Sequence, residues 1–535
     1  MKLTGKNLIA GIWKSGAGGI FTATSALDGT TLPGDFHEAS PTDAMAAVTG
    51  ASEAFATFRR TSPKQRSGFL NCIADEILAL GNALIERCQC ETALPVDRLL
   101  GERARTVAQL RLFAEVALDG SWVDARLDLA DPARTPQPKP DLRRSLVPIG
   151  PIVVFGASNF PLAFSVAGGD TASALATGNP VVVKAHEAHP GTSELVGTAI
   201  SRAVEACGLP PGVFSMLHGP GRTLGPILVQ HSSTRAVALT GSLGAGRALI
   251  AAAMARPDPI PVFAEMGSVN PVFVLSDAIK QSGRQIAEKL CASVAMGVGQ
   301  FCTKPGLFFA TTGEGFREFQ ESLRSAFAAT MPARMLHGGI CGAFHQGVQR
   351  VKAVPGVTTL SVSARNADAS QTHGTPCVMS VDLDTFLTQP ALAEEIFGPY
   401  ALLVKVRDVA DMERAADALA GQLTGSFFAT DRDIAAIQPL LEHVAARVGR
   451  IIFNAVPTGV EVCHAMQHGG PWPATSDSRF TSVGSAALLR FVRPLCLQNA
   501  PASLLPPELR DENPHGIWRM VNGHPTREPI RADLV

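Results

Sequence analysis

The chain has 535 residues, of which 46% are hydrophobic and 17% are charged, and its formal net charge is -1 at pH 7. This length is too great for one hydrophobic core and predicts roughly two to four domains. The composition excludes a disordered chain and the near-zero charge argues against a nucleic-acid surface, so small neutral or anionic molecules are the expected partners.

Residues 1–126 contain two helical patterns and no secretion signal. The apolar spacing is helical in TDAMAAVTGASEAFATFRR (42–60) and in QRSGFLNCIADEILALGNALIERC (65–88). The opening MKLTGKNLIAGIWKSG lacks the apolar run of a signal peptide, and no later segment offers the ~20 apolar residues of a membrane span. Ten irregularly spaced cysteines are typical of reduced thiols. We therefore expect a cytoplasmic protein with no membrane partner.

From about residue 150 onward, short β-branched runs alternate with helix-compatible segments. The runs are continuously apolar, as buried parallel strands are. They read PIVVFG, NPVVVKA, GVFSMLHG, RAVALTG, IPVFAEMG and NPVFVL. The alternation predicts βαβ architecture.

A second series of the same kind follows and predicts a second α/β domain. Its expected strands are GLFFATT, CVMSVDL, YALLVKV, GSFFAT and RIIFNA, with helices at Gly315 to Ala329 and near Asp411 to Ala420. Two Pro-rich segments, 131–151 and the end of the chain from Pro501, fit neither series. We expect them to form arms or edge strands.

One cysteine lies outside any apolar run. In GVGQFCTKPG (297–306), Cys302 is flanked by glycines and followed by a proline. Such residues mark irregular backbone, where functional side chains concentrate. A single cysteine is nevertheless more often structural than catalytic, so this position needs partners to be convincing.

Polar side chains follow three of the expected strands. Asn159 lies in GASNFP, Glu265 in VFAEMGS, and Lys184 with Glu187 follows PVVV. Strand ends of open α/β sheets face the ligand crevice. A thiol, an amide donor and a carboxylate are the complementary parts of covalent acyl chemistry. Each residue alone also has a structural reading, as a helix cap or as a solvated loop charge.

The segment LTGSLGAGRAL (239–249) offers a cofactor loop. A strand, a glycine turn and a helix start follow one another, which presents backbone N–H groups to a pyrophosphate. Its glycines, Gly241, Gly244 and Gly246, do not match GxGxxG. Glycines at such turns are also common for steric reasons alone.

Six motifs of this chain resemble, in order, those of the aldehyde dehydrogenase superfamily, and the similarity runs from about residue 40 to 490. They are NFP with Asn159, KAHE with Lys184 and Glu187, LTGS with Gly241 and Ser242, AEMGSVNP with Glu265, GQFCT with Cys302, and EEIFGP with Glu395 and Phe397. The usual Pro-Trp before the asparagine is Ala157-Ser158 here, and HGGPWPATSDSR replaces a glycine-rich segment. With FAEMGSVNPVFVL and HPGTSELV, these departures resemble the branch that contains enzymes for 2-oxoglutarate semialdehyde and an NADP-linked fatty aldehyde dehydrogenase.

The resemblance implies an aldehyde dehydrogenase-like α/β fold with a Rossmann-type cofactor domain, a catalytic α/β domain and a small oligomerisation arm. It also implies a homodimer or a homotetramer. The implied domains are residues 1–126 with 148–266 for NAD(P), 267–485 for catalysis, and 127–147 with 486–535 for the arm.

The same resemblance assigns roles to the catalytic residues. Cys302 is expected to attack the aldehyde carbon, while the Asn159 amide and the Cys302 backbone N–H hold the oxyanion. Hydride then passes to the nicotinamide, and Glu265 activates the water that hydrolyses the thioester.

The resemblance also implies how the cofactor is held. Lys184 and Glu187 are expected at the adenosine ribose, Gly241 and Ser242 near the pyrophosphate, and Glu395 with Phe397 near the nicotinamide ribose. A carboxylate at Glu187 would repel a 2′-phosphate, which favours NAD. NADP stays possible because Lys184 could neutralise that phosphate.

The expected reaction is oxidation of 2-oxoglutarate semialdehyde to 2-oxoglutarate, with Thr475, Ser476 and Arg479 as candidate substrate contacts. The alternatives are an NADP-linked medium- or long-chain fatty aldehyde dehydrogenase, a coenzyme-A-acylating dehydrogenase, and a binding protein that keeps the fold without the activity. No metal is expected. Zinc at EVCHAMQH, through Glu461, Cys463, His464 and His468, is the weak rival.

Overall fold

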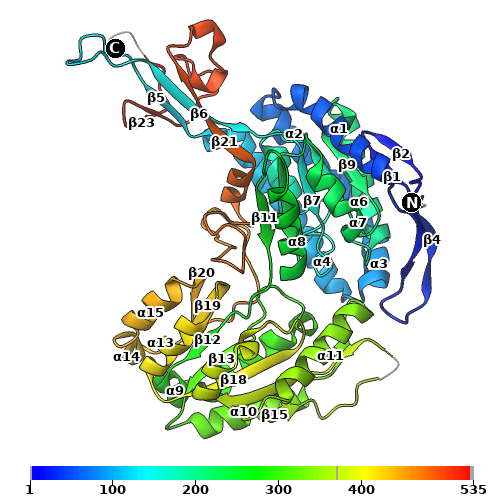
Figure 1. The fold of residues 1–535 in the computed structure, drawn as a ribbon, viewed down its shortest axis with the longest axis vertical. Coiled ribbons are helices and arrows are strands. Elements are labelled where there is room, and N and C mark those ends of the chain that lie inside the picture. Colours follow the sequence, from blue (N-terminus) through cyan, green and yellow to red (C-terminus); the bar gives the residue numbers. More distant parts are fainter. Residues whose placement is uncertain (1–2, 369–370, 531–535) are drawn as a thin grey trace.

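The computed structural model describes residues 3–368 and 371–530. Two seven-stranded sheets dominate the fold, one in the upper and one in the lower body of Figure 1. The first has the order β11-β10-β7-β8-β9-β1-β2. Its strands are β1 (Asn7–Ile9), β2 (Ile12–Lys14), β7 (Ile152–Phe155), β8 (Val181–Lys184), β9 (Phe214–Leu217), β10 (Ala236–Thr240) and β11 (Val262–Glu265).

The five strands β7 to β11 are parallel, β1 joins β9 antiparallel, and β2 forms the edge beyond β1. Successive residues of a strand face opposite sides, so Ile152 and Val154 pack in one core while Val153 and Phe155 pack in another. Apolar residues on both sides are possible because helices cover both faces. One core contains residues of α2 (Pro63–Ala79), α4 (Val96–Asp119), α5 (Gly169–Ala176) and α6 (Pro190–Ala206), and the other contains residues of α1 (Pro41–Phe58), α7 (Gly221–Gln230) and α8 (Leu243–Met254).

The N-terminal helices begin at capping boxes that sequence patterning alone does not locate. Ser40 and Asp43 cap α1, and Ser62 and Gln65 cap α2, which satisfies the free N–H groups of each first turn. The pattern over 65–88 is broken into two helices, because α2 ends before Gly81 and α3 (Gly81–Thr92) starts there in a new direction. Gly81 has a φ of 58°, a conformation that glycine adopts without strain.

No single helix among the described residues is long and apolar enough to cross a membrane. Helices α2 and α3 reach the required length and composition only as a pair, and they are bent by 75° at their break. Phe69, Leu70 and Ile73 of α2 are fully buried against the first sheet.

The second sheet has the order β15-β17-β18-β13-β12-β19-β20 and is parallel except for β15. Its strands are β12 (Val272–Val274), β13 (Leu307–Thr311), β15 (Thr358–Val362), β17 (Cys377–Asp382), β18 (Tyr400–Val406), β19 (Gln422–Phe428) and β20 (Val448–Phe453). The run NPVFVL, which the sequence places with the first series, therefore opens the second sheet as β12. Helices α9 (Ser276–Ala295) and α10 (Phe316–Ala329) cover one face, and α11 (Gly338–Lys352), α12 (Leu383–Thr388), α13 (Val409–Ala418) and α15 (Gln438–Ala445) cover the other.

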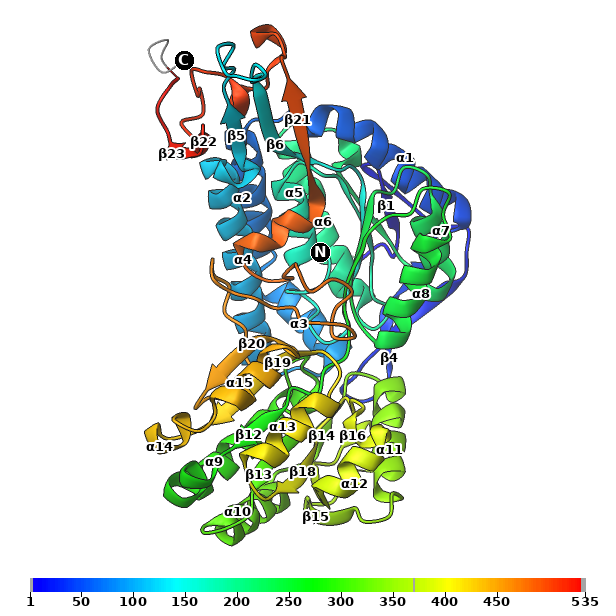
Figure 2. The ribbon, with the colours of Figure 1, turned by 60° about the vertical axis from the view of Figure 1, so that its left-hand side comes forward.

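A five-stranded sheet projects from the first body (Figure 2). Its order is β21-β6-β5-β22-β23, with β5 (Ala125–Asp128), β6 (Leu142–Pro148), β21 (Val492–Gln498), β22 (Arg519–Val521) and β23 (His524–Thr526). Both Pro-rich segments contribute to it, as the composition indicates. Smaller pairs are β3 (Ile20–Thr24) with β4 (Thr31–His37) and β14 (Ala333–Arg334) with β16 (His373–Gly374).

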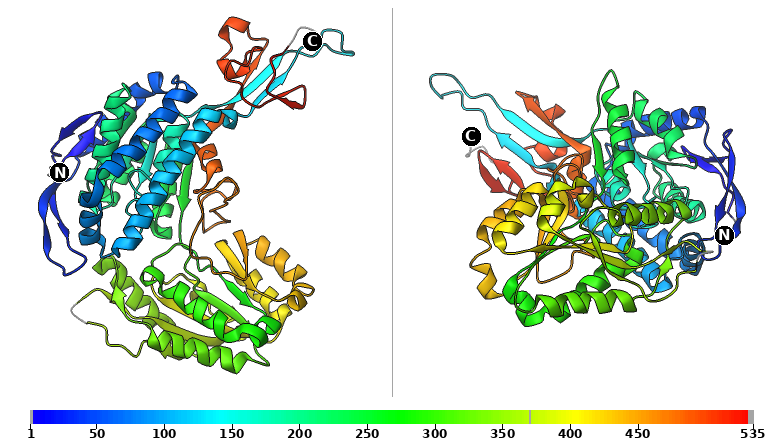
Figure 3. Two further views of the ribbon diagram at one scale, coloured as in Figure 1. Left: turned by 180° about the vertical axis from the view of Figure 1, so that it is seen from behind. Right: turned by 60° about the horizontal axis from the view of Figure 1, so that its bottom comes forward.

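The chain passes between the two bodies twice. It leaves β11 for β12 after Glu265, and after β20 it returns as a long irregular segment, orange in both views of Figure 3, that leads back to the projecting sheet. An antiparallel bridge joins Thr475 of this segment to Glu265. The return segment therefore lies against the carboxyl end of β11.

Candidate active site

Cys302 follows an irregular turn at the end of α9. Gly297, Val298 and Gly299 have φ values of 55°, 58° and 66°, and such a conformation costs a β-branched residue about 1–3 kcal/mol. A Cβ on Gly299 would lie 2.2 Å from the carbonyl of Gly398. A glycine is therefore needed for these two backbone segments to approach each other. The turn fixes the backbone that leads to the thiol.

The backbone just after this turn is held by one side chain that sequence reasoning did not single out. Asn270 donates Nδ2 to the carbonyl of Cys302 at 2.8 Å and to that of Lys304 at 3.0 Å. Its own carbonyl oxygen accepts from Ser268 at 3.0 Å and from Thr424 at 2.9 Å. Because every polar atom of this buried amide is paired, Cys302 is anchored to the second sheet.

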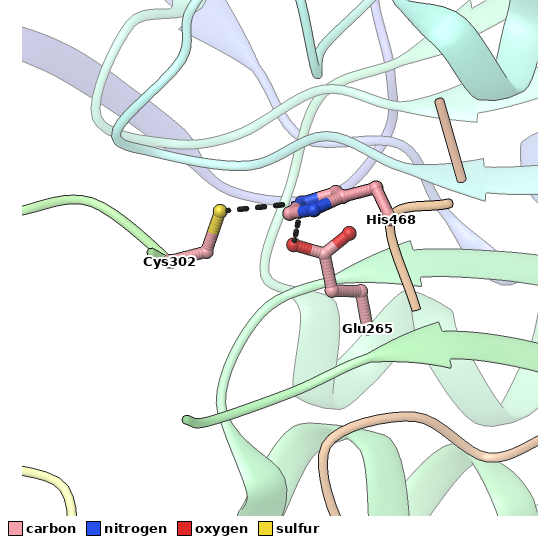
Figure 4. Close-up of side chains that lie close together, drawn as sticks. All are labelled: Glu265, Cys302 and His468. Atoms are coloured by element: carbon pink, nitrogen blue, oxygen red, sulfur yellow. Dashed lines mark hydrogen bonds and ion pairs between the residues drawn. The ribbon is translucent and has the colours of Figure 1, made fainter. Parts of the chain in front are cut away.

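Three side chains from three segments meet at the carboxyl end of β11: Glu265, Cys302 and His468 (Figure 4). His468 Nε2 lies 3.0 Å from Glu265 Oε1 and 3.5 Å from Cys302 Sγ. Ser482 donates its hydroxyl to Glu265 Oε2 at 2.6 Å. His468 and Glu265 are almost completely buried. Because His468 Nε2 donates its hydrogen to Glu265, the Glu265 carboxylate is the group placed to take a proton from the thiol.

The charges at this site depend on burial. Burial and the adjacent Glu265 carboxylate raise the pKa of the Cys302 thiol well above its ordinary value. Burial also acts to raise the pKa of Glu265, but the neighbouring His468 and the hydrogen bonds from His468 and Ser482 bring that pKa below its ordinary value. At neutral pH the carboxylate is ionised and the thiol holds its proton. The thiol must therefore lose a proton before it can act as a nucleophile.

Iodoacetamide should alkylate Cys302 of the free protein slowly at pH 7 and faster as the pH rises through 9, because only the thiolate reacts and its pKa is raised. Glu265→Gln removes a negative charge beside the sulfur and should move the rise in rate to lower pH. The rate is measured on the Cys302 peptide by mass spectrometry. A rate that is flat from pH 7 to 9, or a Glu265→Gln profile shifted to higher pH, contradicts this assignment.

Asn159 lies beside the Cys302 loop, as its motif indicates. Its Nδ2 donates to the carbonyl of Gln300 at 3.0 Å, and the adjacent Phe160 meets Phe301 edge to face with centroids 5.3 Å apart. The structure therefore brings Asn159, Cys302 and Glu265 to the same site.

The structure does not support the alternative zinc site that the sequence suggests in the segment EVCHAMQH. His464 is exposed and contacts Ser485, whereas His468 points to Glu265 and Cys302. Within the described residues, Glu265, Cys302 and His468 are the group of three potential ligands whose atoms come close, within 4.8 Å of one another.

Lys184 and Glu187 form a pair at the carboxyl end of β8. Lys184 Nζ, which is buried, lies 3.1 Å from Glu187 Oε2, and Glu187 Oε1 accepts the N–H of Gly221 at the start of α7 at 3.0 Å. Burial lowers the pKa of Lys184, and Glu187 opposes that effect. A ribose could exchange hydrogen bonds with both groups, so the pair fits the adenosine end of a dinucleotide.

Gly241 and Ser242 lie at the turn from β10 into α8. Ser242 caps the helix by accepting the N–H of Ala245 at 3.2 Å. A Cβ at Gly246 would lie 2.4 Å from the sulfur of Met266, so the glycine lets the helix pack closely on β11 without displacing that side chain. An exposed helix N-terminus at this sheet edge fits a pyrophosphate.

Glu395 lies against the chain between β11 and β12. A Cβ at Gly267 would lie 2.5 Å from Glu395 Oε2. Burial raises the pKa of Glu395 to about 7, and Lys304 opposes this. Lys304 is buried and donates Nζ to the carbonyls of Ile396 and Tyr400 at 3.1 and 3.0 Å, which fixes the loop that also carries Phe397.

The three candidate substrate contacts have other partners here. Thr475 donates to the carbonyl of Gly470, and Ser476 donates to that of Val262 and accepts from Ala264 N. Arg479 is exposed and pairs with Asp477. No hydrogen bond joins these side chains to Cys302; Ser476 ties the return segment to β11, whereas Thr475 and Arg479 pair within that segment.

Sequence reasoning missed His468 and Asn270 as parts of the site. His468 was considered only as a metal ligand, because nothing in EVCHAMQH indicates that the chain turns back toward β11. Asn270 lies inside the motif AEMGSVNP, so a polar residue beside a glycine and before a strand was the available signal.

A parallel sheet with a glycine turn at its ligand edge and a buried thiol beside a carboxylate define a dinucleotide-dependent enzyme with a covalent intermediate. The model of the Aldehyde dehydrogenase family matches residues 13–472. The chain belongs to this family and is an NAD(P)-dependent aldehyde dehydrogenase, which confirms the expected class.

Particular relatives are close. The chain is 48% identical over 524 residues, 98% of this chain and 99% of the relative, to alpha-ketoglutaric semialdehyde dehydrogenase 2 of Azospirillum brasilense. It is 44% identical over 489 residues, 91% and 92% of the two chains, to alpha-ketoglutaric semialdehyde dehydrogenase of Acinetobacter baylyi.

Solved structures confirm the expected fold. Betaine aldehyde dehydrogenase of Staphylococcus aureus in complex with NAD+ has a TM-score of 0.81 at 18% identity, covering 93% of this chain and 96% of that one. A mutant of 1-pyrroline-5-carboxylate dehydrogenase of Thermus thermophilus has a TM-score of 0.78 at 21% identity, covering 92% of each chain.

Proposed function

We propose that the protein oxidises 2-oxoglutarate semialdehyde to 2-oxoglutarate with NAD as the preferred cofactor. The substrate is supported by the two relatives named for alpha-ketoglutaric semialdehyde, another name for the same compound, whose similarity extends over nearly all of both chains. The chemistry is supported above all by the contact of Cys302 with the Glu265–His468 pair.

In the first step the thiol is activated. Glu265, to which His468 Nε2 donates a hydrogen bond, takes the proton of Cys302 and releases it to solvent, and the thiolate adds to the aldehyde carbon. The carbonyl oxygen becomes an oxyanion, which the Asn159 amide and the Cys302 backbone N–H stabilise by hydrogen bonds. Asn159 uses one amide hydrogen on Gln300, so its second is available for the oxyanion.

The cofactor, when bound, supplies the acceptor for the hydride that leaves the former aldehyde carbon. Lys184 and Glu187 would hold its adenosine ribose, the turn at Gly241 and Ser242 its pyrophosphate, and Glu395 with Phe397 its nicotinamide end. The loss of hydride leaves an acyl group on Cys302 as a thioester.

In the last step Glu265 removes a proton from water, which attacks the thioester and releases the acid. The carboxylate is ionised and is held by Ser482 and His468, which leaves it ready to act as a general base. A base at this place favours hydrolysis over the coenzyme-A-acylating alternative, since transfer to a thiol does not need it.

The wild-type enzyme should form reduced cofactor fastest with 2-oxoglutarate semialdehyde and NAD. NADP should have a lower kcat/KM, because its 2′-phosphate would meet Glu187, and Glu187→Gln should raise the NADP:NAD ratio of kcat/KM. The measurement is absorbance at 340 nm with the semialdehyde, pentanal and dodecanal as substrates. A preference for dodecanal would move the function to fatty aldehydes, and a preference for NADP in the wild type would contradict the role of Glu187.

The domain limits inferred from the sequence, the oligomeric state and the location are further parts of the proposal. The strand β21 forms one edge of the projecting sheet and is mostly exposed, and such an edge can pair with another chain. This exposed edge is consistent with a homodimer or homotetramer whose subunits associate through the projecting sheet. Ten free cysteines, with a reactive thiol among them, fit a reducing compartment such as the cytoplasm.

A further inference from the structure

Two arginines near the active site form no ion pair with a described carboxylate, although Glu102 and Glu461 act on Arg105 from a greater distance. Arg105 lies on α4, which runs along the first body, and Arg450 lies on β20 of the second sheet. Neither forms an ion pair with any described residue. Partly buried arginines without an ion pair are unusual, because a partly buried guanidinium generally pairs with a carboxylate.

Each guanidinium has hydrogen-bond donors without a partner. Arg105 donates Nη1 to the carbonyl of Val460, while its Nε and Nη2 are buried without a partner. Arg450 donates Nη2 to the carbonyl of Pro457 at 3.0 Å and places Nη1 3.8 Å from the sulfur of Met466, while its Nε is buried without a partner. Three guanidinium nitrogens are thus out of contact with water and have no hydrogen-bond partner among the described residues.

Both side chains lie close to the reacting thiol. The guanidinium of Arg105 is 5.9 Å from the centre of the Phe164 ring, and that ring is 6.3 Å from the His468 ring. Arg450 contacts Met466, two residues before His468. Burial lowers the pKa of both arginines, and a negative charge on Cys302 opposes that effect in each case. The two cations therefore approach the same sulfur from the two bodies of the molecule.

We propose that Arg105 and Arg450 bind the carboxylate at the far end of the aldehyde substrate. The inference rests on the proposed function, since 2-oxoglutarate semialdehyde carries its aldehyde at one end of the chain and a carboxylate at the other. A carboxylate offers two acceptor oxygens, and arginine binds such a group with paired donors. It would satisfy the unpaired N–H groups and neutralise the two charges in one event.

Arg105 and Arg450 thus take the place of Arg479 as the proposed contacts of the substrate carboxylate. Arg479 is exposed and already forms an ion pair with Asp477. It also gives a reason for preferring a short oxo-acid to a fatty aldehyde. An alkyl chain in the same place would leave the two guanidinium groups buried and unpaired, which is unfavourable. The preference would then arise from the cost of the wrong substrate as much as from attraction to the right one.

A purely structural role is the competing explanation, because both arginines also hold carbonyls of the stretch 457–460. The two explanations predict different effects on the ratio of kcat/KM for a charged aldehyde to kcat/KM for an uncharged one. Loss of a loop contact, or of a positive charge near Cys302, slows every aldehyde alike. Loss of a carboxylate contact slows charged aldehydes selectively, so the ratio of kcat/KM for the semialdehyde to kcat/KM for pentanal isolates it.

The experiment compares Arg105→Gln, Arg450→Gln and Arg105→Lys with a matched control, Arg103→Gln. Arg103 lies on the same helix and donates to the carbonyl of Gly81 at 2.9 Å, away from the site. Arg105→Gln and Arg450→Gln should each lower the semialdehyde:pentanal ratio about 10- to 100-fold, the usual effect of a hydrogen bond to a charged group. Arg105→Lys should lose less, and Arg103→Gln should leave the ratio unchanged.

Binding of the product 2-oxoglutarate to the Cys302→Ala protein, measured by calorimetry, gives a second readout that needs no turnover. Its Kd should rise about 10- to 100-fold in Cys302→Ala combined with Arg105→Gln or with Arg450→Gln. An unchanged ratio together with an unchanged Kd overturns the inference. If the wild type does not oxidise the semialdehyde, the proposed function fails; a Kd for 2-oxoglutarate that still depends on both arginines upholds the carboxylate site.

Discussion

Cys302→Ala should lower aldehyde oxidation by a factor on the order of 10⁴ or more. The reason is that the thiol forms both covalent intermediates, and no neighbouring side chain can replace it. Reduced cofactor is followed at 340 nm over hours, with the wild type diluted to set the detection limit. Cys302 Sγ lies at the end of a buried cluster rather than in a hydrophobic core, so the substitution should cost the fold little.

Cofactor binding provides the control for that variant. Lys184 and Glu187, which are expected to hold the adenosine ribose of NAD, belong to the first body and pair with each other. Titration of NAD by calorimetry should therefore give a Kd close to that of the wild type. Oxidation that survives in Cys302→Ala would remove the thiol from the mechanism, and a misfolded variant would be revealed by lost NAD binding.

Glu265→Gln should lower steady-state turnover about 10²- to 10⁴-fold, the usual contribution of a general base. The glutamine can still accept a hydrogen bond from Ser482, and it keeps the size of the side chain, but it cannot take a proton from water. Hydrolysis of the thioester should then become the slowest step. Rapid mixing should show a burst of reduced cofactor of about one equivalent, followed by a slow phase.

The burst distinguishes the two roles that Glu265 could have. If the carboxylate acts in hydrolysis, the burst is present and mass spectrometry finds an acyl group on Cys302. If it acts only to deprotonate the thiol, the burst disappears and no acyl-enzyme accumulates. Ser482→Ala serves as a matched control, because it removes the 2.6 Å hydrogen bond to Glu265 but leaves the carboxylate.

The strands and the three residues proposed as catalytic could be predicted from the sequence because local signals specify them. Continuous apolar runs such as PIVVFG identify parallel strands, and Cys302 and Glu265 lie in short motifs beside glycines. The break at Gly81 was not predicted, since helical periodicity continues on both sides of it. The apolar pattern also groups β12 with the strands before it, because its sequence is as apolar as theirs, although the domain limits implied by the family resemblance assign it to the catalytic part.

The remaining parts of the site depend on contacts between distant segments, which no local pattern describes. His468 reaches Glu265 across 203 positions of sequence, and it does so because the return segment pairs with β11 through Thr475. Arg105 and Arg450 are ordinary arginines in a helix and a strand until the fold leaves them without an ion pair. They become candidate ligand-binding residues because no carboxylate pairs with them in the fold, and the sequence alone does not show which residues lie around them.

The return of the chain to β11 after the second sheet also determines when the enzyme becomes reactive. A ribosome delivers Glu265 first, then Cys302, and His468 only about 160 residues later, by the order of the sequence. Until that last segment docks, the thiol has no imidazole beside it, and the carboxylate lacks the hydroxyl of Ser482. For the 166 residues made between Cys302 and His468, the nascent protein therefore carries a nucleophile without its neighbours, and the docking of the return segment completes the acid–base group.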